Sequence, residues 1–169
     1  MKLYEVNCEI KNVPKLDPNF IPMEQFHRSF LKTATKPLAI AIERESGHVS
    51  VYETRIHGTQ EMQKADFYYV ERLVKFLLWA KGGFKVTICG DEAVFNHIRT
   101  LYSEDGERAF DAKTMADVYE KPFEVGYRDY NQKPAQNESS KPLGGHMDGC
   151  RIGFDAGGSD RKVSAVMDG

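Results

Sequence analysis

The sequence lacks most features of a secreted or membrane-spanning protein. Its three cysteines, Cys8, Cys89 and Cys150, are odd in number, far apart and without CxxC spacing, which argues against a disulfide framework and a zinc knuckle. The longest apolar run, residues 76–80, is too short to cross a bilayer, and charged residues interrupt the N-terminus before a signal-peptide core could form. We therefore expect reduced thiols, a cytoplasmic location and no membrane partner.

An excess of positive charge is also missing. The 23 lysines and arginines nearly balance the 25 aspartates and glutamates, and the basic residues are scattered along the chain. A nucleic-acid-binding domain typically gathers its basic residues on one face. No pair of helices near the N-terminus has the pattern of a helix-turn-helix, so nucleic acid is not expected as a partner.

The composition itself is globular, with 41% hydrophobic and 28% charged residues. A chain of 169 residues is long enough for one domain, or for one domain and part of another. Residues 1–36 carry three of the seven prolines and predict an irregular wrapping segment with a short helix around residues 23–33. Regular structure is expected from residue 37 onward.

Segments with the apolar spacing of strands and segments with the apolar spacing of helices alternate along residues 37–125. Strands are predicted by alternating or β-branched runs and helices by apolar residues three and four positions apart. The expected elements are a β-hairpin over 37–58 with a turn at Ser46 and Gly47, a helix from Asp66 to Gly82, a strand over 84–90, a helix over 92–103, a weaker helix over 111–119, and a strand over 122–125. The order ββαβα(α)β predicts an α/β fold with a mixed sheet and right-handed crossovers between parallel strands.

Two aspartates in this region are placed to cap helices. Asp66 precedes the first long apolar pattern and Asp91 follows the strand over 84–90. The stretch of Cys89, Gly90, Asp91 and Glu92 is a strand-to-helix junction, where α/β sheets often bind ligands. An N-cap role explains Asp91 without a ligand, and we prefer that interpretation.

The composition then predicts a division of the chain. Residues 127–149 are polar and rich in Pro, Ser and Asn without apolar periodicity, as is typical of a linker. We therefore expect an N-terminal α/β domain over 1–126, a linker over 127–149 and a β-hairpin over 150–169. A two-stranded hairpin is too small to be stable alone.

The hairpin, GCRIGFDAGGSDRKVSAVMDG, has a glycine turn between its strands. Gly157, Gly158 and Ser159 could turn their backbone N–H groups into a phosphate-binding concavity, because glycine lets an anion approach closely. Asp155 would then lie beside the phosphates, where a carboxylate is favourable only with Mg²⁺ between them. In the alternative interpretation the glycines supply positive φ for a tight hairpin, and Asp155 satisfies amides of the turn.

This stretch resembles the first phosphate loop of the sugar-kinase, hexokinase and actin-like ATPase superfamily, and within it most resembles the ROK family of bacterial sugar kinases and regulators. LAIAIERESGHVSVYETRIHG, YVERLVKFLLWAKGG and GERAFDAKTMADVYEKPFEV also resemble the leading region of a ROK-like subgroup. The resemblance implies that the hairpin begins a ribonuclease-H-like ATPase domain. It further implies that Asp155 holds Mg²⁺ through water and that the amides of Gly157, Gly158 and Ser159 face the β- and γ-phosphates of ATP.

By this resemblance the chain is the N-terminal portion of an ATP-dependent sugar kinase, which transfers a phosphoryl group from MgATP to a hexose hydroxyl. The family's catalytic aspartate and sugar-binding residues cannot be placed in this chain, so we expect it to be inactive alone. Its expected partners are the sugar, the remaining C-terminal part or another chain, and copies of itself in a homo-oligomer. One departure from the family pattern, Asp160 followed by Arg161 before Lys162, favours an alternative: a non-catalytic sugar-responsive or interaction module.

Other candidate residues have simpler explanations. His146, Asp148 and Cys150 alternate as metal ligands can, but three side chains on one strand face rarely close a site, and a turn after the linker explains them. Trp79 could stack on a sugar, although its helix favours core or interface packing. His27, His48, His57 and His97 have no serine or carboxylate partner that the sequence assigns, so no catalytic triad is predicted.

Overall fold

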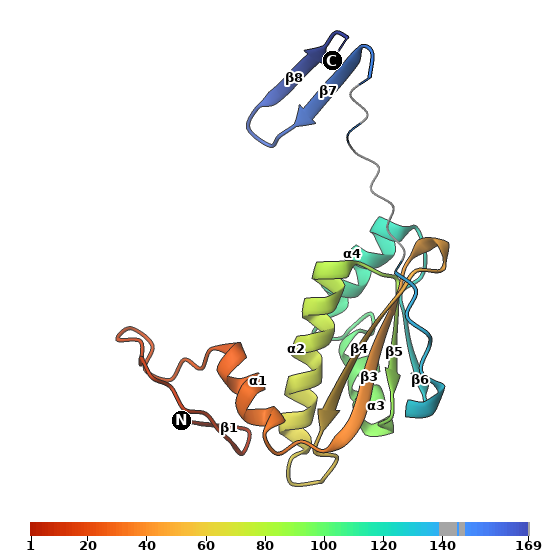
Figure 1. Ribbon diagram of the computed structural model, residues 1–169. Helices are drawn as coiled ribbons and strands as arrows, with labels where there is room; N and C mark the ends of the chain where they lie inside the picture. Colours follow the sequence, from red (N-terminus) through yellow and green to blue (C-terminus); the bar gives the residue numbers. More distant parts are fainter. Residues whose placement is uncertain (139–144, 146–147, 169) are drawn as a thin grey trace. The chain divides into compact units, whose positions relative to one another are not determined.

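The computed structural model describes residues 1–138, 145 and 148–168, and the chain forms two compact units, Met1–Glu138 and Ser139–Gly169. The first unit contains helices packed on one face of a sheet of four strands (Figure 1). The second contains a hairpin made of β7 (Arg151–Ala156) and β8 (Arg161–Val166). The predicted α/β class is confirmed.

The sheet of the first unit is mixed, as predicted. Its strands, in spatial order, are β4 (Val49–Ile56), β3 (Lys36–Glu43), β5 (Lys85–Cys89) and β6 (Glu124–Arg128). The central strand β3 pairs antiparallel with both β4 and β5, whereas β5 and β6 are parallel. The parallel pair requires a long crossover, which the helices between β5 and β6 provide.

The turn between β3 and β4 lies where the sequence predicts it. The short 3₁₀ helix η1 (Glu45–Gly47) connects the strands, and φ is 59° at Ser46 and 70° at Gly47. Two consecutive residues with positive φ match the right-handed twist of a hairpin, which is why a Ser-Gly pair suits this position.

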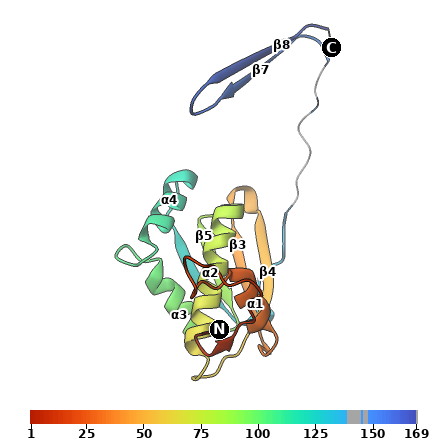
Figure 2. The ribbon, with the colours of Figure 1, turned by 90° about the vertical axis from the view of Figure 1, so that its left-hand side faces the viewer.

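Helices cover one face of the sheet (Figure 2). They are α1 (Met23–Leu31), α2 (Gln63–Lys81), α3 (Glu92–Leu101) and α4 (Ala109–Tyr119). Alternate residues of the central strands point toward them, among them Leu38, Ile40, Ile42, Val86 and Ile88, all of them buried in one core with the apolar stripe of α2. The three- and four-residue spacing seen in the sequence is thus the core-facing stripe of a helix.

The two predicted helix caps differ in outcome. Asp91 is the N-cap of α3, because its carboxylate accepts a hydrogen bond from the Val94 amide at 2.8 Å, and this prediction is confirmed. Asp66 is not a cap, because α2 begins at Gln63, one turn earlier than expected. Its carboxylate instead accepts hydrogen bonds from the amides of His57, at 2.9 Å, and Gly58, at 2.8 Å.

The opposite face of the sheet is covered by the chain that follows β6. Small buried residues of β3 and β5, such as Ala39, Ala41 and Cys89, leave room for it. Its 3₁₀ turn η2 (Tyr130–Gln132) contacts both strands. Gly90, with φ of 111°, has no space for a side chain, since a Cβ there would lie 2.9 Å from the Pro37 oxygen and 3.2 Å from the Tyr130 Cβ.

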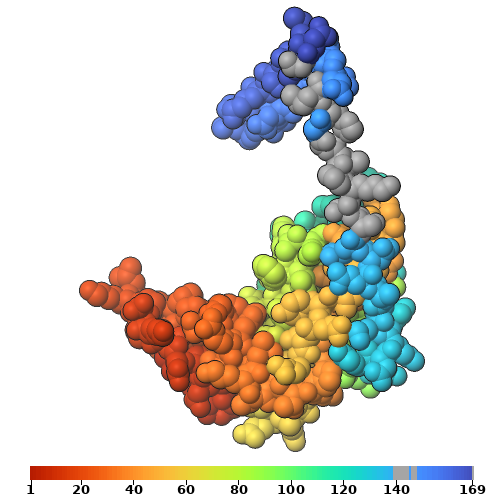
Figure 3. All heavy atoms as spheres, viewed as in Figure 1, coloured from red at the N-terminus to blue at the C-terminus, as the bar shows by residue number. Residues whose placement is uncertain are grey.

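Residues 127–138 therefore belong to the first unit, although the sequence places them in the linker. Hydrogen bonds hold this segment in place: the Tyr130 hydroxyl donates to Glu53 at 2.6 Å, and Asn137 forms a two-bond bridge to Val49 of the edge strand β4. Figure 3 shows the segment, in cyan to blue, on the surface of the unit. The polar composition that predicts a linker here reflects these surface hydrogen bonds.

The N-terminal segment is largely irregular, as expected, and its residues Val6 and Cys8 are buried in the core of the first unit. A minimal pair of strands, β1 (Lys2–Leu3) and β2 (Val6–Asn7), precedes an irregular stretch and α1. Phe26 and Phe30 of α1 are fully buried. In the described part of the chain, none of the helices is both long and apolar enough to cross a membrane.

Candidate functional site

The predicted phosphate-binding residues lie together at the closed end of the hairpin in the second unit. Asp155 is the last but one residue of β7 and lies opposite Lys162 of β8. Gly157, Gly158 and Ser159 follow in the turn, and all of these residues are exposed. The motif therefore forms a strand, a tight turn and a returning strand, which is the local structure expected from its sequence.

The two faces of this hairpin differ in chemistry. Cross-strand pairing places Asp155, Lys162 and Ser164 on one face. On the other face Phe154 and Val163 are each 65% exposed and Ile152 is 80% exposed. A hairpin of two strands cannot bury such a face by itself.

Gly157 is required in the turn because a side chain there would collide with Asp160. Neither Gly157 nor Gly158 has φ in the left-handed region, so the alternative in which they supply positive φ is wrong. A Cβ at Gly157 would lie 2.8 Å from Oδ1 and 2.9 Å from the carbonyl oxygen of Asp160. A Cβ at Gly158 would meet no described atom within 4 Å, so its backbone is open to an approaching ligand.

The carboxylates of the hairpin are of the type that Mg²⁺ prefers, namely hard oxygen ligands. Asp155 ends the polar face, and Asp160 in the turn pairs with Lys162 at 3.3 Å. Among the described residues no group of three or more His, Cys, Asp or Glu side chains is placed to hold a metal. A magnesium ion here would take its remaining ligands from water and phosphate oxygens, as it commonly does in phosphate sites.

The other predicted metal candidate cannot be assembled from the described residues. Asp148 and Cys150 are exposed at the start of the hairpin. His146, the third member, lies outside the described residues. The hairpin turn thus remains the metal and phosphate candidate of the second unit.

The first unit contains a hydrogen-bonded line of three side chains that the sequence does not predict. Thr33 Oγ1 lies 2.9 Å from His57 Nε2, and His57 Nδ1 lies 3.0 Å from Asp66 Oδ1. Thr33 lies just after α1, His57 directly follows β4, and Asp66 is in the first turn of α2. They are 24 and 9 positions apart in the sequence, and only the folded structure brings them together.

A second polar cluster joins α2 to α4. Glu71 and Asp111 are buried acids, and Arg108 contacts both, with its Nε 2.6 Å from Glu71 Oε1. The indole N–H of Trp79 donates to Asp111 at 2.9 Å, while half of this residue remains exposed and its ring stacks on Phe110. Trp79 therefore packs at the interface of α2 and α4, and the structural role of the cluster is to connect these two helices.

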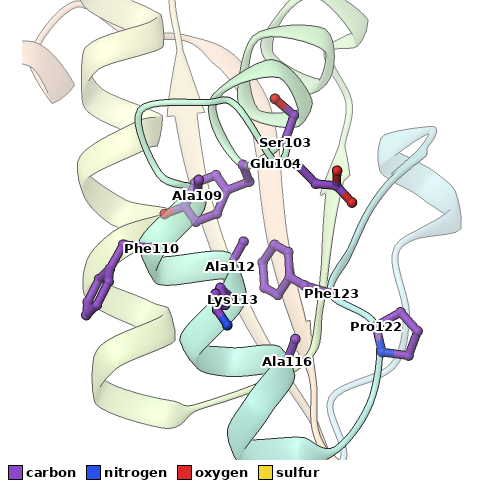
Figure 4. A pocket seen from close by; sticks show the side chains of 10 residues that line it. Ser103, Glu104, Ala109, Phe110, Ala112, Lys113, Ala116, Pro122 and Phe123 are labelled. Atoms are coloured by element: carbon purple, nitrogen blue, oxygen red, sulfur yellow. The ribbon is translucent and has the colours of Figure 1, made fainter.

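A hollow of about 590 Å³ lies beside α4 (Figure 4). One helix face, with Ala109, Ala112 and Ala116, forms one wall, and Pro122 and Phe123 form the other. The ring of Tyr102 also lines it; burial raises the pKa of Tyr102, whose hydroxyl has no hydrogen-bond partner among the described residues. The volume suits a small molecule, and the walls are mainly apolar, with Ser103, Glu104 and Lys113 as further polar or charged side chains beside the hollow.

Comparison of the chain with protein-family models, with curated proteins and with solved structures finds no match.

Proposed function

We propose that this chain is the N-terminal portion of a ROK-like, ATP-dependent sugar kinase, and that its hairpin is the first phosphate loop. The observation that carries the proposal is the position of Asp155, exposed at the end of β7 directly before the turn of Gly157, Gly158 and Ser159. The resemblance of FDAGGSD to the family's loop adds the chemistry: a carboxylate for magnesium and backbone amides for phosphate.

Each residue of the loop has a role that fits its surroundings. Bound Mg²⁺ supplies positive charge between ATP and the protein. Asp155 would hold the ion through water, and the charge of the ion would offset the repulsion between this carboxylate and the phosphates. The amides of Gly157, Gly158 and Ser159 would donate hydrogen bonds to phosphate oxygens, and the open space at Gly158 would let these oxygens approach the backbone closely.

The exposed apolar face of the hairpin supports a larger parent domain. Ile152, Phe154 and Val163 would be buried if the hairpin belonged to a larger sheet with helices packed on this face. Phosphoryl transfer also needs a base for the sugar hydroxyl, and the resemblance assigns that aspartate to a part of the protein beyond this chain. This chain with MgATP and a panel of hexoses should therefore form no sugar phosphate, and robust turnover would contradict the proposal.

Calorimetry of the longer protein that carries this sequence tests the role of Asp155. The Asp155→Ala variant should bind MgATP more weakly than the parent, because the water-mediated magnesium contact is lost. Asp148→Ala, which removes another exposed carboxylate of the same unit, is the matched control and should leave the affinity unchanged. Equal affinity in Asp155→Ala and the parent would remove Asp155 from the site.

One observation favours a second candidate, a non-catalytic interaction module. The Asp160 carboxylate lies against the turn at Gly157, and it places negative charge where phosphate would bind. Lys162 offsets this charge, at 3.3 Å. The test is MgATP binding by the longer protein and by its Asp160→Asn variant. Binding by the variant alone would mean that the Asp160 carboxylate prevents phosphate from binding to the loop, and it would support the non-catalytic interaction module.

A further inference from the structure

The line of Thr33, His57 and Asp66 in the first unit has the geometry of an activated hydroxyl. The two hydrogen bonds, of 2.9 and 3.0 Å, run from the hydroxyl through both ring nitrogens to the carboxylate. The side chains of His57 and Asp66 are only 9% and 3% exposed, whereas Thr33 is exposed. The base is therefore sheltered from water while the hydroxyl can be reached from solvent.

Asp66 fixes the tautomer of the imidazole. An ionised carboxylate can only accept hydrogen bonds, so Nδ1 of His57 carries the proton and Nε2 presents its lone pair to Thr33. The backbone amides of His57 and Gly58 hold the same carboxylate and prevent its rotation. The ring of Phe30 packs edge-on against the imidazole, with centroids 4.6 Å apart, and keeps the ring in this plane.

We propose that Thr33 is a nucleophile that accepts an acyl group from an activated ester, with His57 as its general base and Asp66 as a positioning residue. Oγ1 forms a bond to the carbonyl carbon as Nε2 takes the hydroxyl proton. The carbon–oxygen bond to the leaving group then breaks, and Nε2 returns the proton to the departing alkoxide. The products are a Thr33 ester and an alcohol; attack by water on the ester releases a carboxylic acid and restores Thr33.

Two further observations bear on this step. The Phe30 carbonyl oxygen is a competing acceptor for the Thr33 hydroxyl, but at 3.5 Å it is farther away than Nε2. A hollow of about 270 Å³ lies on the same two elements that lead to Thr33 and His57, lined by Leu31 of α1 and by β4 residues including Thr54. A hollow of this size suits a short acyl chain better than a large substrate.

Reaction with p-nitrophenyl acetate tests the proposal, with release of p-nitrophenolate as the rate and peptide mass mapping as the site. We expect one acetyl group on Thr33. Thr33→Val should remove it, and Thr33→Ser should retain it because the hydroxyl is kept. His57→Gln should slow acetylation by about a hundredfold or more, the usual effect of losing a general base. Thr35→Val, two positions along the chain, is the matched control and should react like the parent.

Two results would overturn the proposal. One is acetylation elsewhere, for example on lysines, with Thr33 unmodified in the parent chain. The other is a folded His57→Gln variant that acetylates Thr33 within a factor of two of the parent rate, since the contact to Thr33 would then be a structural tie alone. If His57→Gln does not fold, the Thr33 variants provide the test. The proposal then fails unless residue 33 is acetylated in both the parent and the Thr33→Ser variant.

Discussion

Replacing Asp66 with alanine should destabilise the first unit severely. The carboxylate is 3% exposed and accepts hydrogen bonds from the amides of His57 and Gly58 and from the His57 ring. It thereby fixes the loop between β4 and α2. In the Asp66→Ala variant these donors lose their acceptor.

The size of the effect follows from how accessible each donor is to water. A buried donor left without a partner costs about 1–3 kcal/mol, and a hydrogen bond to a charged group contributes about 1.5–3 kcal/mol. Gly58 is exposed, so water can replace part of its bond, whereas the His57 donors are largely shielded. We therefore expect the free energy of unfolding to fall by about 2–4 kcal/mol.

Urea unfolding measures this loss, and Trp79, the one tryptophan of the chain, reports on α2 by its fluorescence. For a denaturant dependence of about 2 kcal/mol per molar, the midpoint should fall by about 1–2 M. Asp117→Ala is the matched control, because its carboxylate on α4 is 70% exposed and should change stability by less than about 0.5 kcal/mol. A loss in Asp66→Ala no larger than in this control would refute the reasoning.

Two further predictions concern other carboxylates. Asp91→Ala should cost about 1 kcal/mol of unfolding free energy, while Asp91→Asn, which keeps a capping oxygen, should cost clearly less; equal losses in thermal or urea unfolding would show that the cap is unimportant. For Glu138, hydrogen bonds from Ser50 and Lys81 lower its carboxyl pKa, so Ser50→Ala should raise the pKa in an NMR titration of the side chain. Because this pKa is lowered on folding, the contribution to stability is present above the ordinary glutamate pKa and is lost as the pH falls through the folded value. An unchanged Glu138 pKa in Ser50→Ala would contradict the assigned cause.

The parts of the fold that the sequence predicts are those that local patterns determine. Alternation and helical spacing are properties of neighbouring residues, and they place the hairpin of β3 and β4, the helices and the order of elements. Asp91 is predicted for the same reason, since an N-cap bonds to an amide three residues away. The pairing of β3 with β5 needs tertiary structure, but the element order already limits the sheet to a few arrangements.

Two of the predictions fail because the residue's partner is not the one that the local sequence indicates. Residues 127–138 have the composition of a linker, but Tyr130 and Asn137 hydrogen-bond to β4, about 80 to 90 positions earlier. Asp66 has the residue type of a cap, but its helix begins one turn earlier and its carboxylate serves the preceding loop. Neither the composition of a segment nor the type of a residue identifies its hydrogen-bond partner in the folded chain.

The same distinction separates the two candidate sites. The loop at Asp155 can be identified from consecutive residues, and its geometry adds the exposure of Asp155 and the space at Gly158. No sequence motif marks Thr33, and its proposed role as a nucleophile rests on the distance from its hydroxyl to His57. Because the sites lie in different units, their tests are independent: Asp155→Ala should leave acetylation of Thr33 unchanged, and His57→Gln should leave MgATP binding unchanged. A change in either cross-experiment would mean that the two units are energetically coupled in the protein.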